Sequence, residues 1–350
     1  MDVLYVGSFP PPYGGVTRKN EMLFEALSVR CHSKRIAAGV GAAGKLRQFV
    51  TALFGGGALA IGLGSNSSLR FLSLALLAFA KSKMKRSVVF VMGGTLHEYA
   101  SRHSRFLRAL GCYSRVYVES DTMMWGLSEL GVGNVGVLPN CRVRPENRER
   151  VSVSSSTLRC LFYARICPEK GAEIALEVAR ALPDVLVDFW GELPEGDYKM
   201  HFKASVDELS NCEYRGVFRG SQDAGYRLLA SYDLLLFPST WAHEGVAGTL
   251  VESKVVGLPA VVFDNNFNAE VVRGNEEGLV VERGKCEAFV RAVDALNGDR
   301  QRLRQLSKGA YRSADRFFLD SYFDGVCESL GLGTLADVSA KAKENAELCC

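Results

Sequence analysis

The chain has 350 residues, 47% of them hydrophobic, which is enough to bury two α/β cores of roughly 150 residues each. Its formal net charge of +3 is small for this length and argues against a nucleic-acid-binding protein held by contacts with phosphates. The ten cysteines form no Cys-x-x-Cys pair and no Cys/His spacing suited to zinc, so we expect the reduced, mostly buried thiols of a cytoplasmic protein.

The first residues predict a buried strand, a rigid loop and a helix. Residues 3–7 are apolar, the loop ends in Gly14 and Gly15, and an apolar 3.6-residue periodicity follows, from which we expect Lys19 to lie off the buried face. The glycine pair either lets backbone amides approach a phosphate or simply forms a turn. No basic segment precedes the first apolar run, so we expect no signal peptide.

The uncharged stretch between Arg47 and Arg70 is not expected to span a membrane, because the glycines at 55–57 and a polar run divide it into a short helix, a strand and a turn. Residues 45–54 predict an amphipathic helix, and the basic cluster 81–86 (KSKMKR) follows an apolar helix. Two interpretations stay open: a core-packed helix with a solvated turn, or peripheral contact with an anionic membrane surface.

His97 follows a buried strand over residues 87–92. A histidine there can contact an acceptor or handle a proton, because its ordinary pKa lies near neutrality, but a buried or capping histidine fits equally well. Further on, residues 131–136 match the Gly-x-Gly-x-x-Gly pattern of dinucleotide sites. They follow a helix and open a strand, the reverse of what that pattern requires, so the context argues against a dehydrogenase.

A polar, serine-rich stretch over residues 144–157 predicts a linker between two domains. A strand over 159–164 then leads into a loop that carries Arg165 and Lys170. Both cations are expected at the carboxyl end of the strand beside a helix N-terminus, where ligands of α/β sheets bind. Two ordinary surface cations are the alternative.

A second loop of this kind follows the apolar run 234–237, which Pro238 ends. Glu244 and Glu252 stand eight residues apart, and we expect a helix to begin near Gly248. Carboxylates accept hydrogen bonds from sugar hydroxyls, and a helix N-terminus binds phosphate. Taken alone, the spacing fits a capped surface helix with two solvated glutamates better.

The residues around both loops carry a specific resemblance. The run EGVAGTLVESKVVGLP, from Glu244 on, resembles the Glu-x7-Glu motif of retaining glycosyltransferases of family 4. The run YARICPEKG resembles the same family's Gly-Arg-x4-Lys-Gly segment, with Ala164 in the glycine position. Departures at Val246, Ala247 and Ser253 remove no carboxylate.

The resemblance implies an α/β protein of the GT-B fold, with two Rossmann-like domains facing across an interdomain cleft. The expected parts are an acceptor-side domain (1–143), the linker (144–157), a nucleotide-sugar domain (158–307), a returning helix (308–330) and a tail (331–350). It also implies hexosyl transfer, with retained anomeric configuration and without metal, from a nucleotide-diphosphate sugar to a hydroxyl of a glycan or lipid-linked acceptor. The setting is polysaccharide, lipopolysaccharide or glycolipid synthesis in the cytoplasm, and the donor is a substrate, so no cofactor is expected.

The residues that match the family's motifs receive its roles. Catalytic roles are expected for four residues: Arg165, Lys170, Glu244 and His97. Donor binding is expected for ten: Gly14, Gly15, Gly191, Gly245, Val246, Ala247, Gly248, Thr249, Glu252 and Glu270. By resemblance Arg165 and Lys170 hold the diphosphate, Glu244 the transferred sugar and Glu252 the ribose.

Several departures from the family keep two rival functions open. Met92 stands where many members have histidine, and Asn265 and Asn266 replace the glycines of a Gly-Gly-x-x-Glu loop. A nucleotide-sugar 2-epimerase shares the fold and needs no acceptor, and a catalytically silent accessory subunit would tolerate such changes. The Cys349-Cys350 end could be prenylated, although no polybasic segment supports it.

Overall fold

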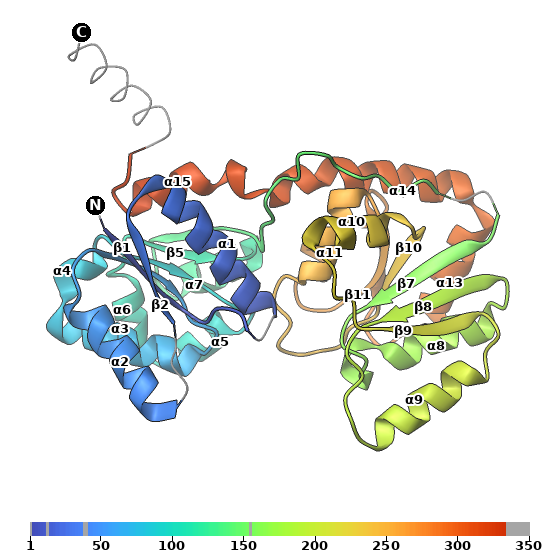
Figure 1. Cartoon of the computed structure of the whole chain (residues 1–350), viewed down its shortest axis with the longest axis horizontal. Coiled ribbons are helices and arrows are strands. Elements are labelled where there is room, and N and C mark those ends of the chain that lie inside the picture. Colours follow the sequence, from blue (N-terminus) through green and yellow to red (C-terminus); the bar gives the residue numbers. More distant parts are fainter. Residues whose placement is uncertain (1, 12–13, 38–40, 154–155, 334–350) are drawn as a thin grey trace, which may run out of the picture. The chain divides into compact units, whose positions relative to one another are not determined.

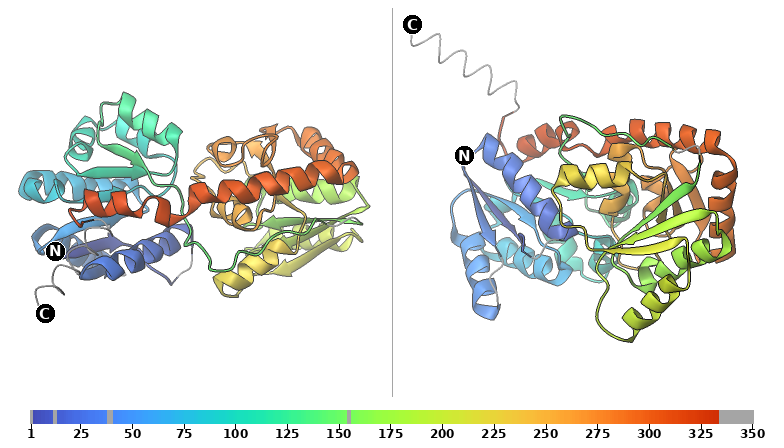
Figure 2. Two further views of the ribbon diagram at one scale, coloured as in Figure 1. Left: turned by 90° about the horizontal axis from the view of Figure 1, so that it is seen from above. Right: turned by 45° about the vertical axis from the view of Figure 1, so that its right-hand side comes forward.

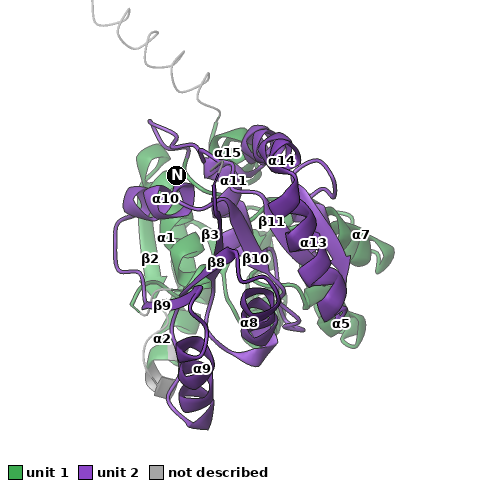
Figure 3. Ribbon diagram, turned by 90° about the vertical axis from the view of Figure 1, so that its right-hand side faces the viewer, with its two compact units in different colours: residues 1–143, 318–350 green, residues 144–317 purple. Residues whose placement is uncertain are grey.

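The computed structural model describes residues 2–11, 14–37, 41–153 and 156–333. The chain divides into two compact units (Figure 3). Unit 1 comprises Met1–Val143 with Phe318–Cys350, and unit 2 comprises Arg144–Phe317. The residues predicted as a linker, 144–157, are thus grouped with unit 2, and the Cys349-Cys350 end lies outside the described residues.

Unit 1 is built on a parallel six-stranded sheet in the order β2-β1-β3-β4-β5-β6 (Figure 1). The strands are β1 Val3–Gly7, β2 Ser33–Ala37, β3 Ala58–Gly62, β4 Val88–Phe90, β5 Arg115–Val118 and β6 Val135–Val137. The helices are α1 Gly15–Arg30, α2 Gly41–Phe54, α3 Asn66–Phe79, α4 Lys81–Met84, α5 Leu96–Ser101, α6 Ser104–Leu110 and α7 Asp121–Glu129, with η3 Leu319–Ser321 and α15 Phe323–Ser329 from the end of the chain.

The first helix differs from its sequence prediction at Lys19, which is buried rather than exposed. Its Nζ lies 2.6 Å from Oε1 of Glu119, which follows β5, and both side chains are almost inaccessible. Next to it Asn20 is fully buried and donates to the carbonyls of Ser8 and Gly62. The apolar periodicity of the helix could not reveal this burial, because Glu119, which pairs with Lys19, lies 100 residues further along the chain.

Residues 319–329 pack on unit 1, but the stretch 308–330 is not the single returning helix that the sequence predicts. The backbone of Phe318 is extended and pairs with Arg142 in an isolated parallel bridge, which interrupts helical hydrogen bonding. The segment therefore forms short 3-10 turns followed by α15. Arg30 on α1 binds Asp324 at 2.9 Å, and the hydroxyl of Tyr117 on β5 donates to the carbonyl of Gly325.

Unit 2 repeats the architecture with a parallel sheet in the order β12-β11-β10-β7-β8-β9. Its strands are β7 Leu158–Tyr163, β8 Val185–Trp190, β9 Cys212–Gly216, β10 Leu234–Phe237, β11 Ala260–Asp264 and β12 Gly278–Glu282. Its helices are η1 Pro168–Lys170, α8 Ala172–Ala181, α9 Asp197–Asp207, α10 Gln222–Ala230, α11 Gly248–Val256, α12 Asn268–Val271, α13 Cys286–Gly298, α14 Arg300–Ser313 and η2 Ala314–Phe317. Helices α8 and α13 cover one face of the sheet, and α10 and α11 the other (Figures 1 and 3).

The order of strands in unit 2 reverses between β7 and β10. From β7 the chain moves outward through β8 and β9, then returns to β10 on the other side of β7 and moves outward through β11 and β12. Leu236 of β10 pairs with Phe162 of β7, so the loops that follow these two strands start side by side. Such a switch point is where open α/β sheets bind ligands.

Two further expectations meet the structure here. Cys141, Cys160 and Cys327 are buried, but the other five described cysteines are partly exposed, so the expectation of mostly buried thiols is wrong. None of the eight is in a disulfide. Within the described part of the chain, no helix combines the length and apolar character needed to cross a bilayer (Figure 2 gives two views of the helices).

Candidate functional site

The switch point of unit 2 brings Lys170 and Glu244 together. The Lys170 ammonium forms an ion pair with Oε2 of Glu244, and Ser239 Oγ donates to the same oxygen at 3.1 Å. The two side chains are 19% and 14% exposed, so the pair is sheltered but reachable from solvent. Residues 74 positions apart in the sequence thus share one polar site.

Lys170 is placed by a tight turn between β7 and α8. The turn η1 ends at Gly171, whose φ of +82° favours glycine, and a Cβ there would lie 2.3 Å from the carbonyl oxygen of Pro238. Thr240 N–H donates to the carbonyl of Glu169 at 2.8 Å. The loops after β7 and β10 are therefore fastened to each other on either side of the ion pair.

Glu244 is held from a third loop, the one that follows β11. The Asn266 side-chain amide donates to the carbonyls of Trp241 at 3.0 Å and of Glu244 at 3.2 Å, and Asn265 also donates to Trp241. Asn266 has a φ of +49°, a conformation that asparagine tolerates better than most residues. The asparagines that replace the family's glycines therefore tie down the loop that carries Glu244.

Arg165 is the exposed cation of the site. It follows β7 directly, and its backbone is fixed because Ala164 N–H donates to Trp190 and Ile166 N–H donates to Glu192. Within the described residues its guanidinium makes no hydrogen bond or ion pair. The fork of donors is thus available to an anion.

Cys167 lies between the two cations. Burial raises the pKa of its thiol above the ordinary value. The thiol is therefore protonated near neutral pH and is a poor nucleophile, because thiolate is the reactive form.

The predicted helix after Glu244 is α11, which starts at Gly248 as expected. Val246 and Ala247 are buried, and Thr249 Oγ1 donates to the carbonyl of Tyr163 at the end of β7. The amides of Gly248 and Thr249, the first two of the helix, lie ahead of the first intrahelical hydrogen bonds, which Leu250 N–H and Val251 N–H donate to the carbonyl of Ala247. Glu252 lies one turn into α11 and is partly exposed.

A buried ionic cluster fixes the other side of α11. The ammonium of Lys254 lies 2.5 Å from Glu277, which also accepts from Arg316 at 2.9 Å. Lys254 is 1% exposed, and burial lowers its pKa to about 8. The cluster anchors the helix whose N-terminus faces the site.

The remaining residues predicted in unit 2 lie just after β8, in the loop before α11 and in α12. Gly191 follows β8 with a φ of +156°, and a Cβ there would meet the carbonyl oxygen of Ala164 at 1.8 Å. Glycine is thus required by chain packing alone. Gly245 is partly buried in the loop before α11, and Glu270 is partly exposed in the four-residue helix α12.

Three predicted residues lie in unit 1. Gly14 is the N-cap of α1 and has an extended backbone, and its N–H donates a hydrogen bond to Thr17 Oγ1 at 2.9 Å. Gly15 opens the helix, and a side chain there would meet nothing within 4 Å. His97 lies on α5 against Gly126, with a buried Nδ1 that has no hydrogen-bond partner in the described part of the protein.

Sequence reasoning missed three residues that build the site: Ser239, Trp241 and Asn266. Trp241 presents its ring 5.9 Å from the Lys170 ammonium. Ser239 and Trp241 fall in the loop between Pro238 and Glu244, so nearness in the chain could have identified them. The role of Asn266 depends on the fold.

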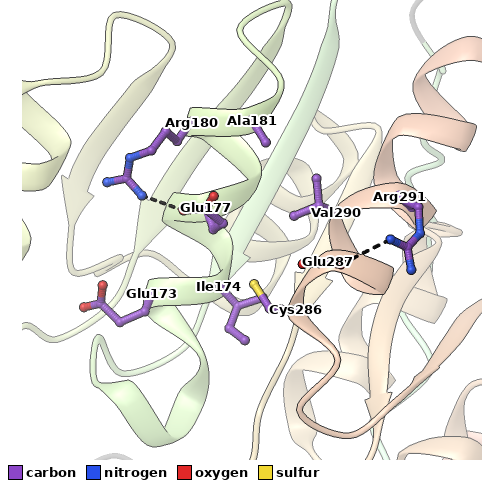
Figure 4. A pocket seen from close by; sticks show the side chains of 9 residues that line it. All are labelled: Glu173, Ile174, Glu177, Arg180, Ala181, Cys286, Glu287, Val290 and Arg291. Carbon is purple, nitrogen blue, oxygen red and sulfur yellow. Dashed lines mark hydrogen bonds and ion pairs between the residues drawn. The ribbon is translucent and has the colours of Figure 1, made fainter.

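A groove elsewhere in unit 2 does not contain these residues. It has a volume of about 640 Å³ and lies between α8 and α13 (Figure 4). Two of the three glutamates that line it are paired with arginines, Glu177 with Arg180 and Glu287 with Arg291 (Figure 4). A second hollow, between residue 273 and α14, also lacks every predicted site residue. In the described ranges, no cluster of three His, Cys, Asp or Glu is arranged for a metal.

Comparison with known proteins bears directly on this unit. Residues 143–313 match the family model described as "Glycosyl transferases group 1". Unit 2 contains a glycosyl transferases group 1 domain. The Lys170–Glu244 pair, Arg165 and α11 all lie inside the matched range.

Two relatives extend the similarity. The lipopolysaccharide core biosynthesis glycosyltransferase LpsE of Rhizobium meliloti is 26% identical over 190 residues, covering 54% of each chain. The UDP-Gal:alpha-D-GlcNAc-diphosphoundecaprenol alpha-1,3-galactosyltransferase of Escherichia coli is 21% identical over 234 residues, covering 63% of this chain and 59% of that one. The chain therefore spans less than two thirds of both curated relatives.

A solved structure shows the fold of the whole chain. The crystal structure of Anabaena Alr3699/HepE in complex with UDP aligns with a TM-score of 0.73 at 17% identity, covering 95% of this chain and 100% of that one. Together with the two parallel sheets, this likeness shows that the glycosyl transferases group 1 domain is half of a two-domain GT-B fold.

Proposed function

We propose that the protein is a retaining, metal-independent glycosyltransferase that moves a hexosyl group from a nucleotide-diphosphate sugar to a hydroxyl acceptor. The observation that carries the proposal is the Lys170–Glu244 ion pair at the switch point of a glycosyl transferases group 1 domain, with Arg165 exposed beside it. Two cations, one carboxylate and a helix N-terminus there form a site for a sugar linked to a diphosphate.

The proposed chemistry breaks the bond between the anomeric carbon and the β-phosphate oxygen, and forms a bond from that carbon to the acceptor oxygen. The proton of the acceptor hydroxyl passes to the departing diphosphate or to solvent, and the diphosphate gains negative charge as its bond to the sugar breaks. Arg165 supplies a planar fork of donors and Lys170 a compact charge. The Lys170 ammonium has three donors, of which Glu244 engages one, so phosphate oxygens can take the others.

The two carboxylates have different places and, we propose, different duties. Glu244 is tied to Lys170, so hydroxyls of the transferred sugar that bind this carboxylate lie beside the leaving phosphate. Glu252 stands one turn into α11, beyond the first amides, where it can bind the ribose. The amides of Gly248 and Thr249 are placed for phosphate.

Metal independence is part of the proposal because Arg165 and Lys170 can neutralise the negative charge of the departing diphosphate. In metal-dependent enzymes Mg²⁺ or Mn²⁺ does this. A chelation test is direct. Turnover in excess EDTA should equal turnover in buffer with Mn²⁺ or Mg²⁺. Complete loss in EDTA, restored by either ion, would contradict this part alone.

The acceptor and the setting are also proposals. The printed names of the relatives concern lipopolysaccharide core synthesis and a diphosphoundecaprenol-linked sugar, and the solved structure holds UDP. They support a nucleotide sugar as donor and a glycan or lipid-linked hydroxyl as acceptor, in polysaccharide, lipopolysaccharide or glycolipid synthesis. The free thiols of the described cysteines support a cytoplasmic location.

The test starts with nucleotide binding. Thermal shifts against uridine, guanosine, cytidine and deoxythymidine diphosphates identify the base, because a ligand at a hundredfold its Kd adds about 2.7 kcal/mol to stability. Sugars of the matching nucleotide are then supplied with and without acceptor. Transfer that needs acceptor supports the proposal, product released from donor alone indicates a 2-epimerase, and no nucleotide binding indicates an accessory subunit.

A further inference from the structure

Unit 1 displays a group of large apolar side chains on two neighbouring helices. Five large apolar side chains are exposed there: Leu46 at 63%, Val50 at 44% and Phe54 at 75% on α2, and Phe71 at 65% and Phe79 at 76% on α3. Single exposed apolar residues are ordinary, but a contiguous set marks an interaction surface. We call these five residues the apolar ridge.

Helical spacing and a ring contact connect the α2 part of the ridge to α3. Leu46, Val50 and Phe54 recur every four residues and therefore share one face of α2. The opposite side of α2 is buried, with Ala52 fully inaccessible. The rings of Phe49 and Phe71, 4.8 Å apart, join α2 to α3.

A basic segment borders the ridge. Lys83 on α4 donates to the carbonyls of Ala52 and Gly55 at 2.7 and 2.6 Å, which fixes α4 against the C-terminal end of α2 where Phe54 lies. Helices α2, α3 and α4 accordingly lie together in unit 1 (Figure 1). The cations around the ridge are exposed: Arg47, Lys81, Lys85 and Arg86.

The charge of this part of the sequence is one-sided. Residues 26–97 contain ten lysines and arginines and no aspartate or glutamate, whereas the whole chain carries only +3. An apolar ridge with a cationic border matches the interface of an anionic lipid bilayer, where aromatic side chains enter the headgroup region and cations contact lipid phosphates. A second copy of this chain fits poorly, because a two-fold interface would bring the same cations together.

We propose that the apolar ridge and the cations beside it form a docking face for an anionic membrane surface. The occupant is a bilayer rich in negatively charged headgroups, contacted peripherally by α2, α3 and α4. The inference does not rest on the proposed glycosyl transfer, since the docking face lies on unit 1 and its binding can be measured without donor or acceptor.

The test is flotation of the purified full chain with vesicles. Binding should be strong to vesicles of phosphatidylcholine with 30% phosphatidylglycerol (roughly the anionic fraction that gives a marked surface potential) and weak to phosphatidylcholine alone. High salt should weaken it, because exposed charges are then screened. Binding that ignores both lipid charge and salt would overturn the proposal.

Two sets of variants separate the apolar and the ionic parts. Phe54→Ser with Phe79→Ser should lower partitioning at least about tenfold, since each ring buries a large apolar area on insertion. The control is Trp125→Ser, which removes another exposed aromatic side chain (60%), on α7, and should leave binding unchanged. Circular dichroism checks that each variant folds.

Charge reversal at Arg47, Lys81 and Lys85 should lower partitioning at least about a hundredfold, because the loss of each basic residue near such a surface accounts for about fivefold and the new acidic residue is repelled as well. Reversal of Arg304, Lys308 and Arg312 on α14 changes the net charge equally and is the control. Equal losses in both triple variants would show that only net charge matters and would overturn the proposal. Self-association that the two phenylalanine substitutions abolish, without vesicle binding, would assign the face to a second copy instead.

Discussion

Replacement of Lys170 by methionine separates catalysis from stability at the candidate site. The substitution keeps most of the aliphatic stem and removes the charge. Glu244, whose side chain is 14% exposed, then retains Ser239 as a hydrogen-bond donor but has no cation. Breaking exposed ion pairs costs about 0.2–1 kcal/mol and breaking buried ones about 3–5 kcal/mol, so this sheltered pair should cost about 1–2 kcal/mol.

A second substitution, Glu244→Gln, should restore the stability lost in Lys170→Met but not the rate. For a domain of this size the loss corresponds to a decrease in Tm of about 2–8 °C. The double variant with Glu244→Gln has neither charge and should regain most of the stability, because removing both partners of a pair is nearly neutral. In contrast, kcat should fall about 10²–10³-fold in Lys170→Met, as for loss of a preorganised donor, and the double variant should not recover it.

The assays are urea unfolding and initial-rate release of nucleoside diphosphate at saturating donor. Lys199→Met is the matched control, because this lysine also forms an ion pair, with Glu195 at 2.6 Å, and lies on α9, which packs against the edge strand β9. It should leave kcat and Tm unchanged. If Lys170→Met keeps kcat near that of the wild type, or if Glu244→Gln restores both stability and rate, Lys170 is a structural residue and the reasoning fails.

Other predictions concern neighbouring residues. Glu252→Ala should weaken binding of nucleoside diphosphate at least about tenfold, whereas Glu244→Ala should lower kcat and leave nucleotide affinity unchanged. Equal losses of nucleotide affinity in both variants, measured by calorimetry, would refute this division of roles between the two carboxylates. Asn266→Gly, which suits the positive φ but removes the donor to the Glu244 loop, should lower kcat about tenfold with donor KM little changed, and a change in KM alone would contradict a positioning role. Burial lowers the folded-state pKa of Lys254 to about 8, below its unfolded value, so above pH 8 the unfolded chain binds more protons than the folded one. The free energy of unfolding of the wild type, measured relative to that of Lys254→Met, should therefore rise from pH 8 to pH 10. A difference that does not change with pH would show that the pKa of Lys254 is not lowered.

Local sequence signals predicted the central elements of unit 2 well. The run 234–237 is a buried strand, Pro238 follows its end, and α11 begins at Gly248. Both features depend on neighbouring residues: an apolar run, a proline and a helical periodicity. The sequence also predicts that residues 131–136 follow a helix and open a strand, and this is confirmed, since α7 precedes them and β6 begins within them.

What the sequence did not predict depends on partners that are distant in the chain. The edge strand β2 is partly exposed and polar, so it lacks the apolar run that marks the inner strands. Lys19 is buried because Glu119 meets it, and the predicted terminal helix is interrupted because Arg142 pairs with Phe318. In the site itself, Asn266 looked like a loss of donor contacts, whereas in the fold it restrains the loop of Glu244.

The most direct test of the account is proton NMR of the reaction of the purified chain with the nucleotide sugar selected by thermal shift and a hydroxyl acceptor. We predict that the anomeric signal of the donor decays while a new glycoside signal of the same configuration appears, in the presence of EDTA and only when acceptor is present. A glycoside of inverted configuration, or consumption of donor without acceptor, would contradict it.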